Sequence, residues 1–174
     1  HAAGSEGAHL RVLEQDEERN QLADLVAEGD KRQFADARFR RELASWIHAG
    51  RGRTRDGMPA HALEIPGRFT PFAPLLVRTF DVGQGTAAHD RKIAEHSPVL
   101  AVLCTPDDTD RDWLIAGQAL ARVLLRATQD EVSASFLNQP IEVAELRASV
   151  SRLAQVGVPQ LVLRLGYGPT VKPT

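Results

Sequence analysis

The sequence is poor in cysteine and has no long apolar run, and each absence excludes a class of protein. Cys104 is the only cysteine among 174 residues, which excludes an intrachain disulfide and a cysteine-based metal cage. A reducing, cytoplasmic compartment is therefore expected. No stretch approaches the roughly 18 apolar residues that a membrane span needs, so we expect no membrane association. The formal net charge of −2 lacks the basic excess of a typical nucleic-acid binder, and we expect no nucleic-acid partner.

The side-chain patterns of common enzyme classes are also missing. The sequence has no Gly-x-Ser-x-Gly nucleophile motif, and no pair of histidines has the spacing of a metal site. His89, Asp90 and Glu95 are better explained as a solvated helix face than as a cluster. The paired carboxylates Asp107 and Asp108 precede an expected helix, where capping explains them. We therefore predict no catalytic side chain and no metal, and expect that a cofactor would supply any enzymatic reactivity.

The sequence does contain a succession of strand and helix patterns. Apolar alternation or continuous apolar runs predict strands at residues 8–13, 98–103, 132–137 and 159–165, with 75–80 as a strand or an extended arm. Helical periodicity predicts helices at residues 16–29, 34–48, 86–96, 113–128 and 142–154, the first ended by Gly29. Residues 98–103 are apolar throughout, so we expect a central strand covered on both faces and a buried Cys104 beside it. This order predicts a sheet flanked by helices.

Residues 51–74 have a different character. They contain seven glycines and prolines and show no sustained periodicity, which is uncommon for a connection inside a compact domain. Arg51, Arg53 and Arg55 make the start of this segment basic. A solvated surface loop explains these features, and so does a lid that closes over an anionic ligand. The sequence does not begin with methionine, and Met58 is its only one, so we expect a piece of a longer chain.

Several blocks resemble the nitroreductase family, and together they cover nearly the whole chain. They are residues 116–127, 133–140 and 159–169, with further similarity in residues 38–46, 56–59 and 97–103. The final strand followed by Gly166-Tyr-Gly-Pro169 is moderately specific, whereas the helix block alone would be weak. More narrowly, the chain resembles the C-terminal half of the Acg-like, actinobacterial subgroup, in which one chain carries two nitroreductase-like halves.

The resemblance implies a fold, a cofactor and a site. The implied fold is a single α+β domain over residues 1–174, a three-layer α-β-α structure with a mixed, mainly antiparallel sheet. The implied cofactor is FMN, with NAD(P)H as a candidate reductant. In nitroreductases the turn after the relevant strand presents backbone amides to the flavin ring near N5 and O4, and that turn matches Phe136, Leu137, Asn138 and Gln139 here. Gly166 and Lys172 match the segment that leads to the flavin phosphate.

Two family blocks are absent from this chain. The family's N-terminal Arg-x-Ser-x-Arg phosphate anchor and its Asn-x-Gln-Pro-Trp block have no match. Both would belong to a missing N-terminal half, so we expect that half, or a second copy in a homodimer, as a partner. The resemblance implies reduction of a small nitro or quinone-like acceptor by the longer protein. A non-catalytic flavin-sequestering protein and a purely structural dimerisation half remain as alternatives.

Overall fold

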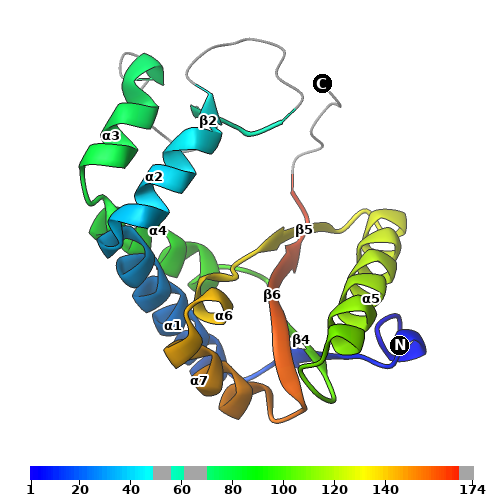
Figure 1. The fold of residues 1–174 in the computed structure, drawn as a ribbon. Helices are drawn as coiled ribbons and strands as arrows, with labels where there is room; N and C mark the ends of the chain where they lie inside the picture. The colour runs from blue at the N-terminus through cyan, green and yellow to red at the C-terminus, as the bar shows by residue number, and fades with distance from the viewer. Residues whose placement is uncertain (49–55, 61–69, 169–174) are drawn as a thin grey trace. The chain divides into compact units, whose positions relative to one another are not determined.

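The computed structural model describes residues 1–48, 56–60 and 70–168 (Figure 1). The chain forms two compact units, one from His1–Gly29 with Ala87–Thr174 and the other from Asp30–Thr86. The elements are, in chain order, η1 (Gly4–Glu6), β1 (His9–Leu13), α1 (Asp16–Ala35), α2 (Ala37–Trp46), β2 (Ile47–His48), β3 (Met58–Pro59), η3 (Thr70–Phe72), α3 (Ala73–Thr79), α4 (Gly83–Glu95), β4 (Val99–Thr105), α5 (Asp110–Gln129), β5 (Ser133–Phe136), α6 (Gln139–Glu142), α7 (Ala144–Ala154) and β6 (Val158–Gly166). Within the described ranges, no helix has the length and apolar character to cross a membrane.

The first unit is built on a four-stranded sheet with the order β1-β4-β6-β5. Every neighbouring pair in this sheet is antiparallel. β4 lies between β1 and β6, where Leu100 is opposite Leu13 and Val102 is opposite Val162. The side chains of β4 from Leu100 onward are fully buried. The prediction of a central apolar strand is therefore confirmed, and β5 is an edge strand of the sheet.

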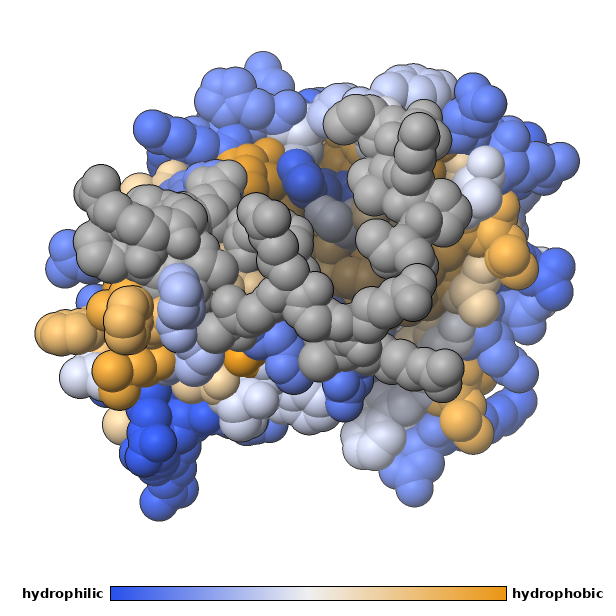
Figure 2. All heavy atoms as spheres, turned by 90° about the horizontal axis from the view of Figure 1, so that it is seen from above, coloured by the Kyte–Doolittle hydropathy of each residue, from blue (hydrophilic) through white to orange (hydrophobic). Residues whose placement is uncertain are grey.

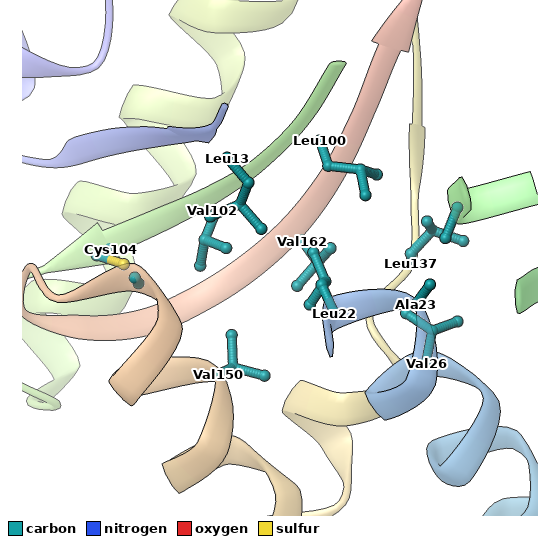
Figure 3. Packing of buried hydrophobic residues seen from close by; sticks show 12 residues of the cluster. Leu13, Leu22, Ala23, Val26, Leu100, Val102, Cys104, Leu137, Val150 and Val162 are labelled. Atoms are coloured by element: carbon teal, nitrogen blue, oxygen red, sulfur yellow. The ribbon is translucent and has the colours of Figure 1, made fainter. Parts of the chain in front are cut away.

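Helices cover both faces of this sheet (Figure 1). On one face, Leu22 of α1 and Val150 of α7 share a buried cluster with Val102 and Val162 of the sheet, as Figure 3 shows. On the other face, Val123 of α5 and Leu103 of β4 share a second buried cluster. Leu103 and the preceding Val102 point to opposite faces because side chains alternate along a strand. Each fully buried leucine or valine of these clusters contributes roughly 1.5–3 kcal/mol. Three layers result, and the predicted α+β fold class is confirmed.

Cys104 lies in the first of these clusters, at the buried end of β4 (Figure 3). Its side chain is fully buried and forms no disulfide. Burial raises the pKa of its thiol to about 11, because a thiolate would lose its hydration there. The predicted role of Cys104 as a small buried hydrophobic residue is confirmed.

The prediction that Gly29 ends the first helix is wrong, because α1 continues to Ala35. A Cβ added to Gly29 would lie 2.7 Å from Cβ of Gln139 and 2.8 Å from its carbonyl carbon. The glycine therefore permits a close approach of α1 to the start of α6. This contact between distant segments outweighs the low helix propensity of glycine, which costs about 1 kcal/mol in a helix interior.

The prediction of a strand or extended arm at residues 75–80 is also wrong, because Ala73–Thr79 forms the helix α3. Pro74 lies in its first turn, where proline is compatible with a helix. Ala73 and Val77, four residues apart, are buried on one face. A short apolar run does not distinguish a strand from a buried helix by periodicity alone, which accounts for the error.

The second unit has its own small apolar cluster. Phe34, Ile47, Ala60, Ala73 and Val77 form it, and the rings of Phe34 and Phe39 meet edge to face with centroids 5.5 Å apart. The parallel pair β2–β3 joins residues 47–48 to 58–59. The lid hypothesis for residues 51–74 depends largely on 51–55 and 61–69, which lie outside the described residues.

Candidate functional site

The segment that the resemblance assigns to a cofactor lies at the end of the edge strand. β5 ends at Phe136 and α6 begins at Gln139, so Leu137 and Asn138 form the connection. The N–H of Leu137 donates to the carbonyl of Val162 over 3.0 Å. The N–H of Val162 donates to Oδ1 of Asn138 over 2.9 Å. A side chain thus completes the ladder between β5 and β6 and fixes the backbone of the connection.

Two backbone amides of this segment form no hydrogen bond with β6. Successive residues of an antiparallel strand point their N–H groups to opposite sides, so the N–H of Phe136 points to the open edge of the sheet. The N–H of Asn138 has no hydrogen-bond partner among the described residues. The side chain of Phe136 is 48% exposed. The segment therefore offers two donors that do not titrate, together with an aromatic ring, which suits the acceptor-rich edge of a planar heterocycle.

Gln139 is held in place by its side chain. Its Nε2 donates to Oδ2 of Asp90 on α4 over 2.8 Å, and its backbone lies against Gly29. These contacts tie the start of α6 to two other helices of the first unit. Asp90 was expected on a solvated helix face, but it accepts a hydrogen bond from a residue on another helix of the unit.

Gly166 lies apart from the other predicted site residues. It pairs with Ser133 at one end of β5, whereas Phe136 pairs with Leu163 at the other end. Three residues of strand separate the two positions, which corresponds to about 10 Å. A Cβ on Gly166 would lie 3.0 Å from Cγ of Pro98. Lys172, the other predicted residue for the phosphate end, lies outside the described residues.

Gly166 lines a hollow of about 310 Å³ that sequence reasoning missed. We call it the Arg164 hollow; it is bounded by Ser97 and Pro98 before β4, by residues 133–135 of β5 and by residues 164–168. Nε of Arg164 donates to Oγ of Ser135 over 2.5 Å, directly across the strand pair. The signal in the sequence is one arginine that directly follows the apolar residues 161–163 of β6.

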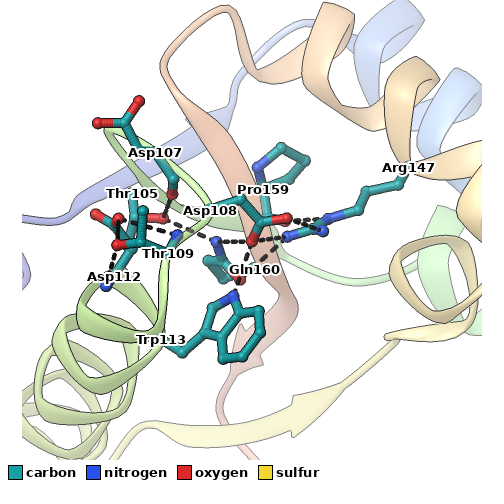
Figure 4. Close-up of polar contacts among 9 residues, drawn as sticks. All are labelled: Thr105, Asp107, Asp108, Thr109, Asp112, Trp113, Arg147, Pro159 and Gln160. Carbon is teal, nitrogen blue, oxygen red and sulfur yellow. Dashed lines mark hydrogen bonds and ion pairs between the residues drawn. The ribbon is translucent and has the colours of Figure 1, made fainter.

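A second polar cluster joins the loop before α5 to α7 and β6 (Figure 4). Arg147 donates to both carboxylate oxygens of Asp108, with Nη1–Oδ2 at 2.6 Å and Nη2–Oδ1 at 2.9 Å. Nε1 of Trp113 donates to the same carboxylate over 2.8 Å, and Nε2 of Gln160 does so over 3.1 Å. These bonds hold the pKa of Asp108 well below its ordinary value, with Arg147 as the largest cause.

The expectation that capping explains Asp107 and Asp108 is wrong. The cap of α5 is Thr109, whose side chain accepts from the N–H of Asp112, while the Asp112 carboxylate accepts from the N–H of Thr109. Asp108 instead forms the ion pair with Arg147. Across the described ranges, no group of three or more His, Cys, Asp or Glu side chains is arranged to hold a metal ion.

The outer face of α5 carries large exposed apolar side chains. Leu114 is 71% exposed and Leu125 is 73% exposed. They lie eleven residues apart, which is three helical turns, and Ala121 lies between them on the same face. Figure 2 shows hydrophobic atoms reaching the surface on the side where α5 lies in Figure 1. We call Leu114, Ala121 and Leu125 the α5 outer face.

Comparisons with known proteins bear on the family of this chain. No family model matches the chain. The chain is 31% identical over 163 residues, 91% of its length, to the protein named "Putative NAD(P)H nitroreductase Rv3131" of Mycobacterium tuberculosis strain H37Rv, and equally to MT3217 of the same name from strain CDC 1551. It is 36% identical over 94 residues, 53% of its length, to "Uncharacterized protein Rv3127" of strain H37Rv. It spans 45% of the first two relatives and 26% of the third. This similarity supports the nitroreductase family, for a chain that spans about half the length of the nitroreductase-named relatives.

Proposed function

We propose that this chain is one half of a nitroreductase-like protein that binds FMN and uses NAD(P)H to reduce small nitro or quinone-like acceptors. The observation that carries the proposal is the 31% identity over 91% of the chain to a relative named as a putative NAD(P)H nitroreductase. The chain spans 45% of that relative, so the activity is proposed for the longer protein.

The connection after β5 is the proposed contact with the flavin ring. The outward N–H groups of Phe136 and Asn138 fit the acceptor atoms of the ring edge, and the exposed Phe136 side chain offers an apolar surface. When bound, FMN would supply the hydride chemistry. Leu137 and Gln139 position this edge, through the bond to Val162 and the bond to Asp90 respectively.

The phosphate end of the cofactor requires groups from elsewhere. The N-terminal anchor of the family has no match in this chain, and the match to Lys172 lies outside the described residues. We propose that a second half, or a second copy of this chain, supplies the anchor. The α5 outer face is the proposed surface for that partner, because Leu114 and Leu125 expose apolar area that association would bury.

Exposure of the α5 outer face also favours a second candidate, a half that serves assembly only. The test uses the full-length gene product, purified without added flavin. The proposed enzyme is supported if the protein contains bound flavin, if NAD(P)H reduces this flavin, and if an added nitro or quinone acceptor reoxidises it. Bound flavin with no NAD(P)H oxidation supports a flavin-sequestering protein. If the protein contains no flavin and binds no FMN in a titration, both the enzyme and the flavin-sequestering protein are contradicted, and the assembly role remains.

A further inference from the structure

The Arg164 hollow contains one charged side chain. Arg164 lines it, and no aspartate or glutamate does so among the described residues. Its Nε is committed to Ser135. Its two Nη groups form no ion pair with a carboxylate in the described part of the chain, where the ion pairs involve other arginines and His48. A partly buried guanidinium without a counterion is left with unsatisfied donors and an uncompensated charge.

The surroundings add to the positive character of this place. Arg19 donates through Nη2 to the carbonyl of Ser97 and through Nη1 to that of Pro98, over 3.5 Å in the second case. Both residues line the hollow, so a second guanidinium lies next to its rim. A concave site with low-dielectric walls and charge of one sign concentrates ions of the opposite sign.

The hollow also offers neutral hydrogen-bonding groups. Ser97, Ser133 and Ser135 line it, and a hydroxyl can rotate to donate or accept. Ser135 accepts from Nε of Arg164, which fixes the plane of the guanidinium and leaves its Nη groups for a ligand. A guanidinium presents such donors as a fork that matches the two oxygens of a carboxylate or phosphate.

From this arrangement we infer that the Arg164 hollow binds a small oxyanion, a carboxylate or a phosphate group, with Arg164 as its anchor. The volume of about 310 Å³ is at the lower end for small-molecule sites, which fits a small acid or the acidic end of a larger ligand. Gly166, which the resemblance places near the flavin phosphate, also lines the hollow, but the inference goes beyond the proposed function because its anchor, Arg164, is not among the residues proposed for the flavin.

The test uses the 174-residue chain and two probes, benzoate and inorganic phosphate, each titrated at constant ionic strength with chloride as the balance. Amide NMR signals of Ser133, Gly166 and Gly168 report the hollow. We expect saturable shifts with at least one probe, and the probe that binds identifies carboxylate or phosphate as the source. R164Q should weaken that binding about 10-fold or more, as expected for the loss of a charge-assisted contact.

R164K and R152Q are the matched variants. R164K keeps the charge without the fork, so its binding should fall between those of wild type and R164Q, and it serves as the test if R164Q does not fold. R152Q removes the same charge from an exposed position on α7, outside the hollow, and should bind as wild type does. Absence of saturable shifts with both probes, or equal binding by wild type and both Arg164 variants, would overturn the inference.

Discussion

The carboxylate of Asp108 and the guanidinium of Arg147 meet in a two-bond contact, with N–O distances of 2.6 and 2.9 Å. Arg147 also donates to the carbonyl of Pro159 over 3.0 Å and to Oε1 of Gln160 over 3.1 Å. Gln160 in turn donates to Oγ1 of Thr105 over 2.8 Å. The pair therefore joins the end of β4, the loop before α5, helix α7 and the start of β6 in one network (Figure 4).

Removal of Arg147 should destabilise the first unit modestly. Its side chain is 27% exposed and that of Asp108 is 38% exposed, so solvent screens the pair and R147Q should cost about 1 kcal/mol. Urea unfolding at neutral pH measures this cost. R152Q, on the same helix, removes an exposed arginine whose bond goes to Ser149 and should change stability by less. Equal stability of the two variants would contradict a role for the pair.

The contribution of Asp108 should depend on pH in one direction. Its pKa is lowered in the folded state, so its charged form stabilises the fold above the unfolded value of about 3.9. This stabilisation is lost as the pH falls from there toward the folded pKa. The difference in unfolding free energy between wild type and D108N should therefore shrink below about pH 4. A difference that stays constant down to the acid limit of folding would refute the assignment.

Two helical glycines should respond oppositely to substitution by alanine. G29A would place a Cβ against the backbone of Gln139 and should destabilise the protein by about 1–3 kcal/mol through overpacking. A Cβ on Gly117 of α5 meets nothing within 4 Å, so G117A should stabilise by up to about 1 kcal/mol through helix propensity. Thermal unfolding of both variants checks the signs. Stabilisation by G29A would show that α1 does not approach α6 this closely.

The α5 outer face should drive association of the 174-residue chain. Leu114 and Leu125 are both more than two-thirds exposed, and we expect a two-fold dimer at tens of micromolar. L125E should give a monomer by light scattering. Q129E adds a charge at an exposed polar position on the same helix and should leave the dimer intact. A monomeric wild-type chain at these concentrations would contradict the proposal.

Cys104 should react with thiol reagents only when the protein unfolds. Its side chain is fully buried and burial raises its pKa to about 11, so the folded state holds a neutral, inaccessible thiol. Labelling with iodoacetamide at pH 8 should be slow in buffer and complete in denaturing urea. Fast labelling under native conditions would mean that β4 is not the covered central strand.

Local patterns predicted the parts of the fold that depend on local chemistry. The apolar run of β4 and the helix predicted at residues 113–128 both have direct counterparts in the structure. Contacts between distant segments could not be predicted in this way. The bonds of Asp108 to Arg147 and Gln160 span 39 and 52 residues, and the packing of Gly29 on Gln139 joins different helices.

The candidate site shows the same division. The family resemblance selected residues 136–139, but only the pairing of β5 with β6 shows which of their amides bond to β6 and which do not. Leu137 is buried and its N–H is bonded to β6, so proline there would damage the sheet before it tested any ligand. Arg164 was missed because its partner, Ser135, lies on another strand. The single-domain organisation and the site residues remain predictions.

The most direct test of the proposed flavin contact compares N138P with N138A in the full-length gene product. Asn138 has φ −83°, close to the value that proline fixes, so both variants can keep the backbone conformation. Both variants lose the hydrogen bond between Oδ1 of Asn138 and the N–H of Val162, but only N138P loses the N–H of residue 138.

The measurement is the FMN affinity and the flavin content of each purified protein, with folding checked by circular dichroism. We predict that N138A retains flavin and that N138P binds it about 10-fold more weakly, because one hydrogen bond to the ring is lost. Equal flavin binding by two equally folded variants would contradict the claim that this segment contacts the flavin.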